Sequence, residues 1–186
     1  MKKTQWLFAI LFALLCCTFT MAQASPAEPL TVAKVLDQDI ASVEHAFVSA
    51  AEAMPEDKYD FVPTAGEFKG VRTFAQQIKH VAVSNYGMAA GILGEKPPVD
   101  IGTGNGPDAL KSKAEIIKFL KASFEYSHKA VLSMTDKNQL EPMGAQFGNV
   151  PRLRIALRIS RHASDHYGQI VEYLRMNGII PPASRQ

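Results

Sequence analysis

Three histidines in this sequence have the spacing and surroundings of metal ligands. His162 and His166 lie four residues apart in "RHASDHYGQIVEYLRMNGIIPP", a stretch with helical periodicity. Side chains at positions i and i+4 of a helix share one face, so two imidazoles can converge on one metal ion. Catalytic zinc sites usually take three protein ligands, which leaves a two-histidine site incomplete. His80, in "FAQQIKHVAVSNYG", is the best third candidate.

A helical wheel places His162 and His166 in the middle of an apolar stripe, which also holds Ile155, Ile159, Ile170 and Tyr173. The charged residues of the same stretch fall on another side: Arg154, Arg158, Arg161, Asp165 and Glu172. Burying two imidazoles is costly unless their nitrogens find partners. Taken alone, the pair leaves a metal site and an ordinary pair of hydrogen-bonded core histidines equally open.

The remaining histidines are weaker candidates. His45 falls opposite the apolar stripe of its helix and is expected to face solvent, and His128 is expected at a stripe boundary rather than as a fourth ligand. Asp165 and Gln169 flank the pair and are candidates for outer support of the ligands, with Asp165 expected to point away. Tyr173 shares the stripe and is expected either to line a pocket or to pack.

Two other chemistries share these features. "HASDH" is similar to the inverted zinc-protease pattern, but Asp165 replaces its glutamate and only 20 residues follow His166, too few for the distant carboxylate ligand. The sequence has no attachment motif for covalent haem, and an i, i+4 pair cannot place ligands on opposite faces of one iron. Haem held by one histidine and one methionine stays open without support.

The elements that must position these residues are four helices, expected at about 31–54, 73–94, 108–134 and 149–177. Thr73 with Gln76 and Ser112 with Glu115 have the spacing of capping boxes. Asn149 is expected to cap the last helix, and Asn177-Gly178 to end it. No strand pattern intervenes. The sequence therefore predicts an all-α four-helix bundle with a long crossover loop between the second and third helices.

The first 24 residues have the anatomy of a secretory signal peptide, with Lys2 and Lys3, an apolar run and a small-x-small site ending at Ala24. Cleavage there would leave one domain, 25–186, without a stable membrane anchor, exported to the periplasm or secreted. Both cysteines, Cys16 and Cys17, would be lost. The 20 basic residues would lose two and equal the 18 acidic ones, which gives no support for nucleic-acid binding.

From about residue 33 to 182, the chain resembles the DinB-like family of metal-dependent four-helix-bundle proteins. Three features carry the resemblance: His80 in "GVRTFAQQIKHVA", the pair His162 and His166 followed by "GQI", and the closing "YLRMNGIIPP". The resemblance implies a divalent metal, such as zinc, nickel, iron or manganese, bound by His80, His162 and His166 with solvent completing its coordination. It also implies a tendency to form homodimers.

The same resemblance implies a relationship to bacillithiol and mycothiol S-transferases, in which a metal would bind a thiol and lower its pKa. A metal-dependent transferase or hydrolase acting on an unidentified small molecule is therefore the first functional hypothesis. The alternative is a non-catalytic metal-binding or dimerising module. An open coordination position facing a cavity would favour the first hypothesis, and a closed site without a pocket would favour the second.

Overall fold

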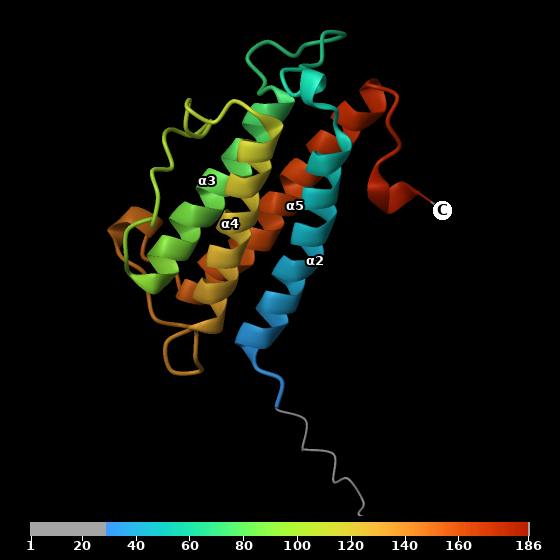
Figure 1. Ribbon diagram of the computed structural model, residues 1–186. Coiled ribbons are helices and arrows are strands. Elements are labelled where there is room, and N and C mark those ends of the chain that lie inside the picture. The colour runs from blue at the N-terminus through green and yellow to red at the C-terminus, as the bar shows by residue number, and fades with distance from the viewer. Residues whose placement is uncertain (1–28, 186) are drawn as a thin grey trace, which may run out of the picture.

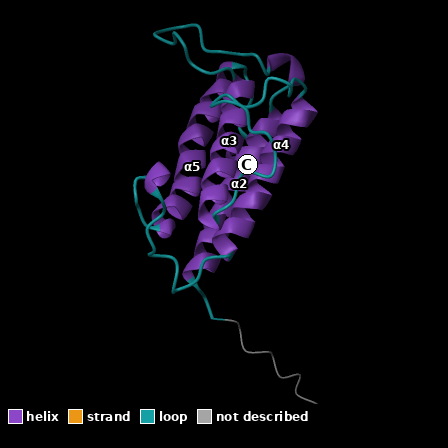
Figure 2. Cartoon of the chain, turned by 90° about the vertical axis from the view of Figure 1, so that its left-hand side faces the viewer, coloured by secondary structure: helices purple, strands orange, loops and turns teal. Residues whose placement is uncertain are grey.

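The computed structural model describes residues 29–185 of the 186-residue chain. Within that part, four α-helices lie together and no strand forms (Figures 1 and 2). They are α2 (Val32–Ala53), α3 (Phe74–Leu93), α4 (Lys113–Leu132) and α5 (Arg152–Met176). Short 3-10 turns lie between these helices at η1 (Glu56–Lys58) and η2 (Ala145–Phe147), and after the last helix at η3 (Pro182–Ser184). The predicted all-α four-helix bundle is confirmed, while the predicted signal peptide, residues 1–24, lies outside the described residues.

The helices are arranged so that α3 packs on α4, α4 on α2, α2 on α5, and α5 on α3. In Figure 1, α2 and α5 run upward and α3 and α4 run downward. Because α3 and α4 are parallel neighbours, the chain must return along the bundle between them, and segment 94–112 makes this crossover. The two helices that carry the three candidate histidines, α3 and α5, are direct neighbours.

The helix ends follow local side-chain chemistry. The Thr73 hydroxyl accepts from the Gln76 amide while the Gln76 side chain accepts from the Thr73 amide, so both halves of the capping box at α3 are present. Ser112 and Glu115 make the same reciprocal pair at α4. Gly94 ends α3 with a φ of 72°, in the left-handed region where a glycine carries no Cβ penalty.

Two predicted helix starts were wrong. The third helix begins at Lys113 instead of Asp108, because Ser112 is its N-cap. The fourth begins at Arg152 with Pro151 at the N-cap position and no side-chain cap. Asn149 has a φ of 53°, so it forms part of a left-handed turn and does not cap the helix. The Ser112 capping box was placed correctly and only the helix range was begun too early, whereas at the fourth helix a capping residue type was matched to a residue of the preceding turn.

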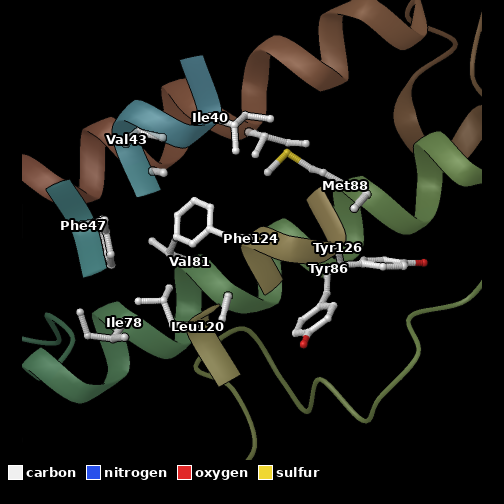
Figure 3. Close-up of a cluster of buried hydrophobic side chains, with 14 of the residues drawn as sticks. Ile40, Val43, Phe47, Ile78, Val81, Tyr86, Met88, Leu120, Phe124 and Tyr126 are labelled. Carbon is white, nitrogen blue, oxygen red and sulfur yellow. The ribbon is translucent and has the colours of Figure 1, made fainter. Parts of the chain in front are cut away.

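The core is formed by all four helices, and Figure 3 shows part of it, with Ile40 and Phe47 from α2, Ile78 from α3 and Phe124 from α4 pointing toward one another. Fully burying a side chain of this size contributes roughly 1.5–3 kcal/mol. Val32, the first residue of α2, is 38% exposed.

None of the helices between residues 29 and 185 combines the length and apolar character needed to cross a bilayer.

Candidate metal centre

His80 is held in place by the crossover. It lies two turns into α3, and its ring Nδ1–H donates to the main-chain oxygen of Gly104. The neighbouring Lys79 is buried, and its ammonium donates to the carbonyl oxygen of Pro107 at 3.1 Å. These two contacts tie the same stretch of crossover to α3. The half-buried His80 ring is thereby fixed in orientation. Its second nitrogen, Nε2, takes no part in the hydrogen bond to Gly104.

His162 and His166 come from the buried face of α5. Their stripe companions Ile155, Ile159 and Ile170 are each 4% exposed or less, as the helical wheel predicted. His166 is 6% exposed and His162 is half-buried. All the charged residues that the wheel placed away from this stripe are exposed: Arg154, Arg158, Arg161, Asp165 and Glu172.

The structure brings the three histidines together across the α3–α5 interface. Ring centroids are 5.1 Å apart for His80 and His162, 4.8 Å for His80 and His166, and 4.6 Å for His162 and His166. One nitrogen from each ring lies within 4.8 Å of the other two. Nitrogens bound to one tetrahedral zinc at about 2.0–2.1 Å are about 3.4 Å apart. Small side-chain movements would therefore bring the three nitrogens to bonding distance of one metal ion.

A relay of two glutamines orients His166. Gln77 Nε2 donates to Gln169 Oε1 at 2.9 Å, which turns the Gln77 oxygen toward α5. That oxygen can only accept, so the His166 Nδ1–H donates to it, at 2.7 Å. The proton is thus fixed on Nδ1, and Nε2 keeps its lone pair. Metal-ligating histidines are commonly held in this way by a hydrogen bond at their other nitrogen.

His162 has a nitrogen for which the described part of the chain supplies no partner. Its Nδ1 is buried, and no protein group hydrogen-bonds to it. An unpaired buried polar atom of this kind costs about 1–3 kcal/mol. A metal ion at the three-histidine cluster would give the ring a partner that the protein does not. The donor set of three imidazoles also suits zinc, iron or nickel, so the residues present fit a divalent metal.

Burial disfavours the protonated form of all three rings. Burial lowers the pKa of His162 to about 4, and the neighbouring histidines and Arg158 add to that effect. Burial lowers the pKa of His166 to about 4 as well, assisted by His80. Burial also lowers the pKa of His80. Neutral imidazoles are required for metal binding, because protonation removes the lone pair that forms the bond.

The residues predicted around the cluster have different roles. Gln169 supports His166 indirectly by fixing Gln77. Asp165 is exposed and forms no hydrogen bond to a histidine ring of residues 29–185, in line with the expectation that it points away. Tyr173 packs edge-on against Phe61 and donates its hydroxyl to the main-chain oxygen of Arg72 at 3.0 Å.

His45 and His128 lie away from the cluster. His45 is exposed on α2. His128, on α4, sits at the edge of the buried stripe between two carboxylates of α2, with Asp37 at 2.7 Å and Glu44 at 3.0 Å. Its contacts therefore hold α4 against α2 and add no fourth ligand to the three-histidine cluster.

Sequence reasoning missed three contributors to the site: Gln77, Gly104 and Arg72. Gln77 lies three residues before His80 on α3, but its contact with His166 joins residues 89 positions apart and depends on how the helices pack. The Gly104 contact uses a main-chain oxygen, which no residue type signals. Arg72, whose charge adds to burial in lowering the pKa of His80 and His166, lies in the loop before α3, where the sequence pattern assigned no role.

The fold and the cluster together define a helical bundle with three neutral histidines converging from two neighbouring helices. In helical bundles, side chains from facing helices build metal sites in this way, so the three histidines could hold a metal ion. The family model of the DinB superfamily matches residues 40–170, a span that includes all three histidines. The chain belongs to the DinB superfamily.

Solved structures show the same fold. A conserved protein from Enterococcus faecalis aligns with a TM-score of 0.60 at 12% sequence identity, covering 77% of this chain and 95% of that one. At this identity the similarity concerns the fold alone. No curated protein matches the sequence.

Proposed function

We propose that this protein binds one divalent metal ion through His80, His162 and His166, and that the metal serves a transferase or hydrolase reaction on a small molecule. When bound, such a metal supplies Lewis acidity, which lowers the pKa of a coordinated water or thiol and makes it a nucleophile at neutral pH. The observation that carries the proposal is the convergence of three neutral imidazoles, two of them oriented by hydrogen bonds at Nδ1.

The protein's own residues supply preorganisation. Gly104 and Gln77 hold the rings of His80 and His166 before any metal arrives, so little side-chain freedom is lost on binding. His80 and His162 are half-buried residues and are not fully enclosed by the protein. A site of this kind can admit a water or substrate atom as a further ligand, which favours a catalytic role over a closed structural one.

Metal content tests this proposal directly. Protein purified without a histidine tag should retain close to one equivalent of a divalent metal, or take it up after addition. His162→Ala should abolish binding, whereas His45→Ala, which removes an exposed imidazole on α2, should leave it unchanged. Less than about a tenth of an equivalent after metal addition, or equal effects of the two substitutions, would contradict the three-histidine assignment.

We also propose that the chain is exported and cleaved after Ala24, on the basis of its amino-terminal sequence. N-terminal sequencing of the protein from a cell-envelope or culture fraction should then begin at Ser25. Recovery of the chain with residues 1–24 intact, and only in the cytosol, would refute export.

A further inference from the structure

A small polar cleft lies beside the histidine cluster, where α3 begins. It has a volume of about 330 Å³ and is lined by residues from three separate parts of the chain, including Arg72 just before α3 and Gln76 in its first turn, Asn105 in the crossover and Gln169 on α5. Ligand pockets start at roughly this size. The cleft therefore has room for one small chemical group and a short stretch of the molecule that carries it.

Arg72 gives this cleft a positive charge that forms no ion pair within the described part of the chain. Its Nε–H donates to Asn105 Oδ1 at 2.8 Å, which fixes the plane of the guanidinium. Among residues 29–185, no carboxylate forms an ion pair with Arg72 and no acceptor engages its two Nη groups. The lining contains no acidic residue, so the Nη donors remain available to a ligand.

The positive charge of the cleft does not come from unpaired main-chain N–H groups at the start of α3. The amides at the start of α3 donate to protein oxygens, two of them to the main-chain oxygens of Tyr59 and Phe61 and a third to the Thr73 hydroxyl. A ligand entering the cleft would therefore meet the Arg72 guanidinium and side-chain amides. A planar guanidinium with two free Nη groups matches the geometry of a carboxylate or phosphate, which it can bind through two parallel hydrogen bonds.

The cleft is joined to the histidine cluster through a shared wall. Gln77 and Gln169 both line it, and Gln77 also accepts the hydrogen bond from His166. Arg72 is close enough for its charge to act on the histidines: after burial, it contributes to the lowered pKa of both His80 and His166. A molecule held by Arg72 would thus have one end a single side-chain layer from the proposed metal ligands.

We propose that this cleft binds the oxyanion group, a carboxylate or a phosphate, of the protein's small-molecule substrate, with Arg72 as its charged contact. The amide side chains of Gln76, Asn105 and Gln169 offer further hydrogen bonds. The substrate's reactive end would then lie toward His80, His162 and His166. This orientation rests on the proposed metal-dependent function, whereas anion binding by the cleft does not.

Anion titrations monitored by two-dimensional ¹H–¹⁵N NMR test the proposal. Metal-free protein is titrated with inorganic phosphate and, separately, with succinate, at constant ionic strength set by chloride. Metal-free protein is used first because both anions also bind free metal ions. At least one anion should saturate with a Kd below about 10 mM, and the shifted signals should centre on Arg72, Asn105 and Gln169. The anion that binds more tightly distinguishes phosphate-bearing from carboxylate-bearing substrates.

Substitutions at matched charge separate this cleft from general electrostatic attraction. Arg72→Gln should weaken binding at least tenfold, while Arg154→Gln, which removes an exposed arginine of α5 outside the cleft, should change it less than twofold. Arg72→Lys keeps the charge and the aliphatic stem but loses the planar fork. It should bind more weakly than the wild type and provides the test if Arg72→Gln alters the spectrum of the fold.

Three results would overturn the proposal: no saturable binding of either anion, shifts spread over the surface, or equal effects of the Arg72 and Arg154 substitutions. Repeating the succinate titration on protein loaded with one equivalent of zinc separates this inference from the metal assignment. Zinc uptake without anion binding would refute the cleft alone. Saturable anion binding at Arg72 in a protein that takes up no metal would support the cleft and refute the proposed function.

Discussion

The lowered pKa values of the three clustered histidines predict how much metal affinity is lost in acid. Protons compete with a metal for each imidazole by a factor of about 1 + 10^(pKa − pH). For a histidine with an ordinary pKa of 6.5, lowering the pH from 7.5 to 5.5 costs about tenfold in affinity, and three such ligands would cost about 1000-fold. A lowered pKa shifts this competition to more acidic solution, so the metal is retained as the pH falls.

In this protein the cost should be far smaller. His162 and His166 have a pKa of about 4, so at pH 5.5 each is protonated only by a few per cent. Even an ordinary pKa at His80 would limit the total loss to about tenfold, and burial lowers that pKa too. We therefore expect the zinc affinity to fall by less than about tenfold between pH 7.5 and 5.5.

Isothermal titration calorimetry of zinc into metal-free protein at pH 7.5, 6.5 and 5.5 measures this directly. His45→Ala serves as the control, because an exposed imidazole outside the cluster should make no difference at any of these pH values. A loss of affinity of about 100-fold or more between pH 7.5 and 5.5, with the protein still folded, would show that the histidines are not held neutral by burial. The reasoning about the cluster would then be wrong.

Three further substitutions test the surrounding structure. Gln77→Leu removes the acceptor that orients His166 and should weaken zinc binding about 10–100-fold in calorimetry. Burial lowers the pKa of His128, but hydrogen bonds to its two carboxylate partners outweigh this and leave the pKa raised, so stability from this residue is present in acid and lost as pH rises. His128→Gln should therefore cost more unfolding free energy at pH 5.5 than at pH 9 in urea titrations. Gly91→Ala should destabilise by about 1–3 kcal/mol because a Cβ would collide with the Phe147 ring. Gly87→Ala, with open space around it, should not.

The fold could be predicted from the sequence largely because its helices are defined locally. The capping boxes at Thr73 and Ser112 involve residues three positions apart, and both form as the pattern indicates. The start of α5 could not be predicted in the same way. Asn149 is a common capping residue, but it also tolerates the left-handed conformation that the turn before α5 requires. Residue type alone does not distinguish these two uses.

The candidate site could likewise be predicted where its residues share one helix, and could not be predicted where they come from distant segments. Helical periodicity was enough to put His162 and His166 on one buried face, because both lie on a single element. His80 could be named from the sequence only as the best third candidate, and the family resemblance assigned it to the site, since its approach to α5 depends on the packing of helices remote in sequence. Gln77 and Arg72 belong to the site only through contacts that form between distant segments, and these are set by tertiary structure.

Because the three histidines come from both α3 and α5, a metal bound to them would also affect the stability of the chain. A metal held by His80 and His162 would connect positions 82 residues apart, from 80 to 162. A covalent cross-link closing a loop of that length restricts the unfolded chain by about 4–5 kcal/mol in the chain-entropy model. Both cysteines lie within the first 17 residues, so residues 18–186 cannot form a disulfide of their own. A coordinated metal would act as a reversible cross-link within these residues. It would form or be lost with the metal supply and not with the redox conditions.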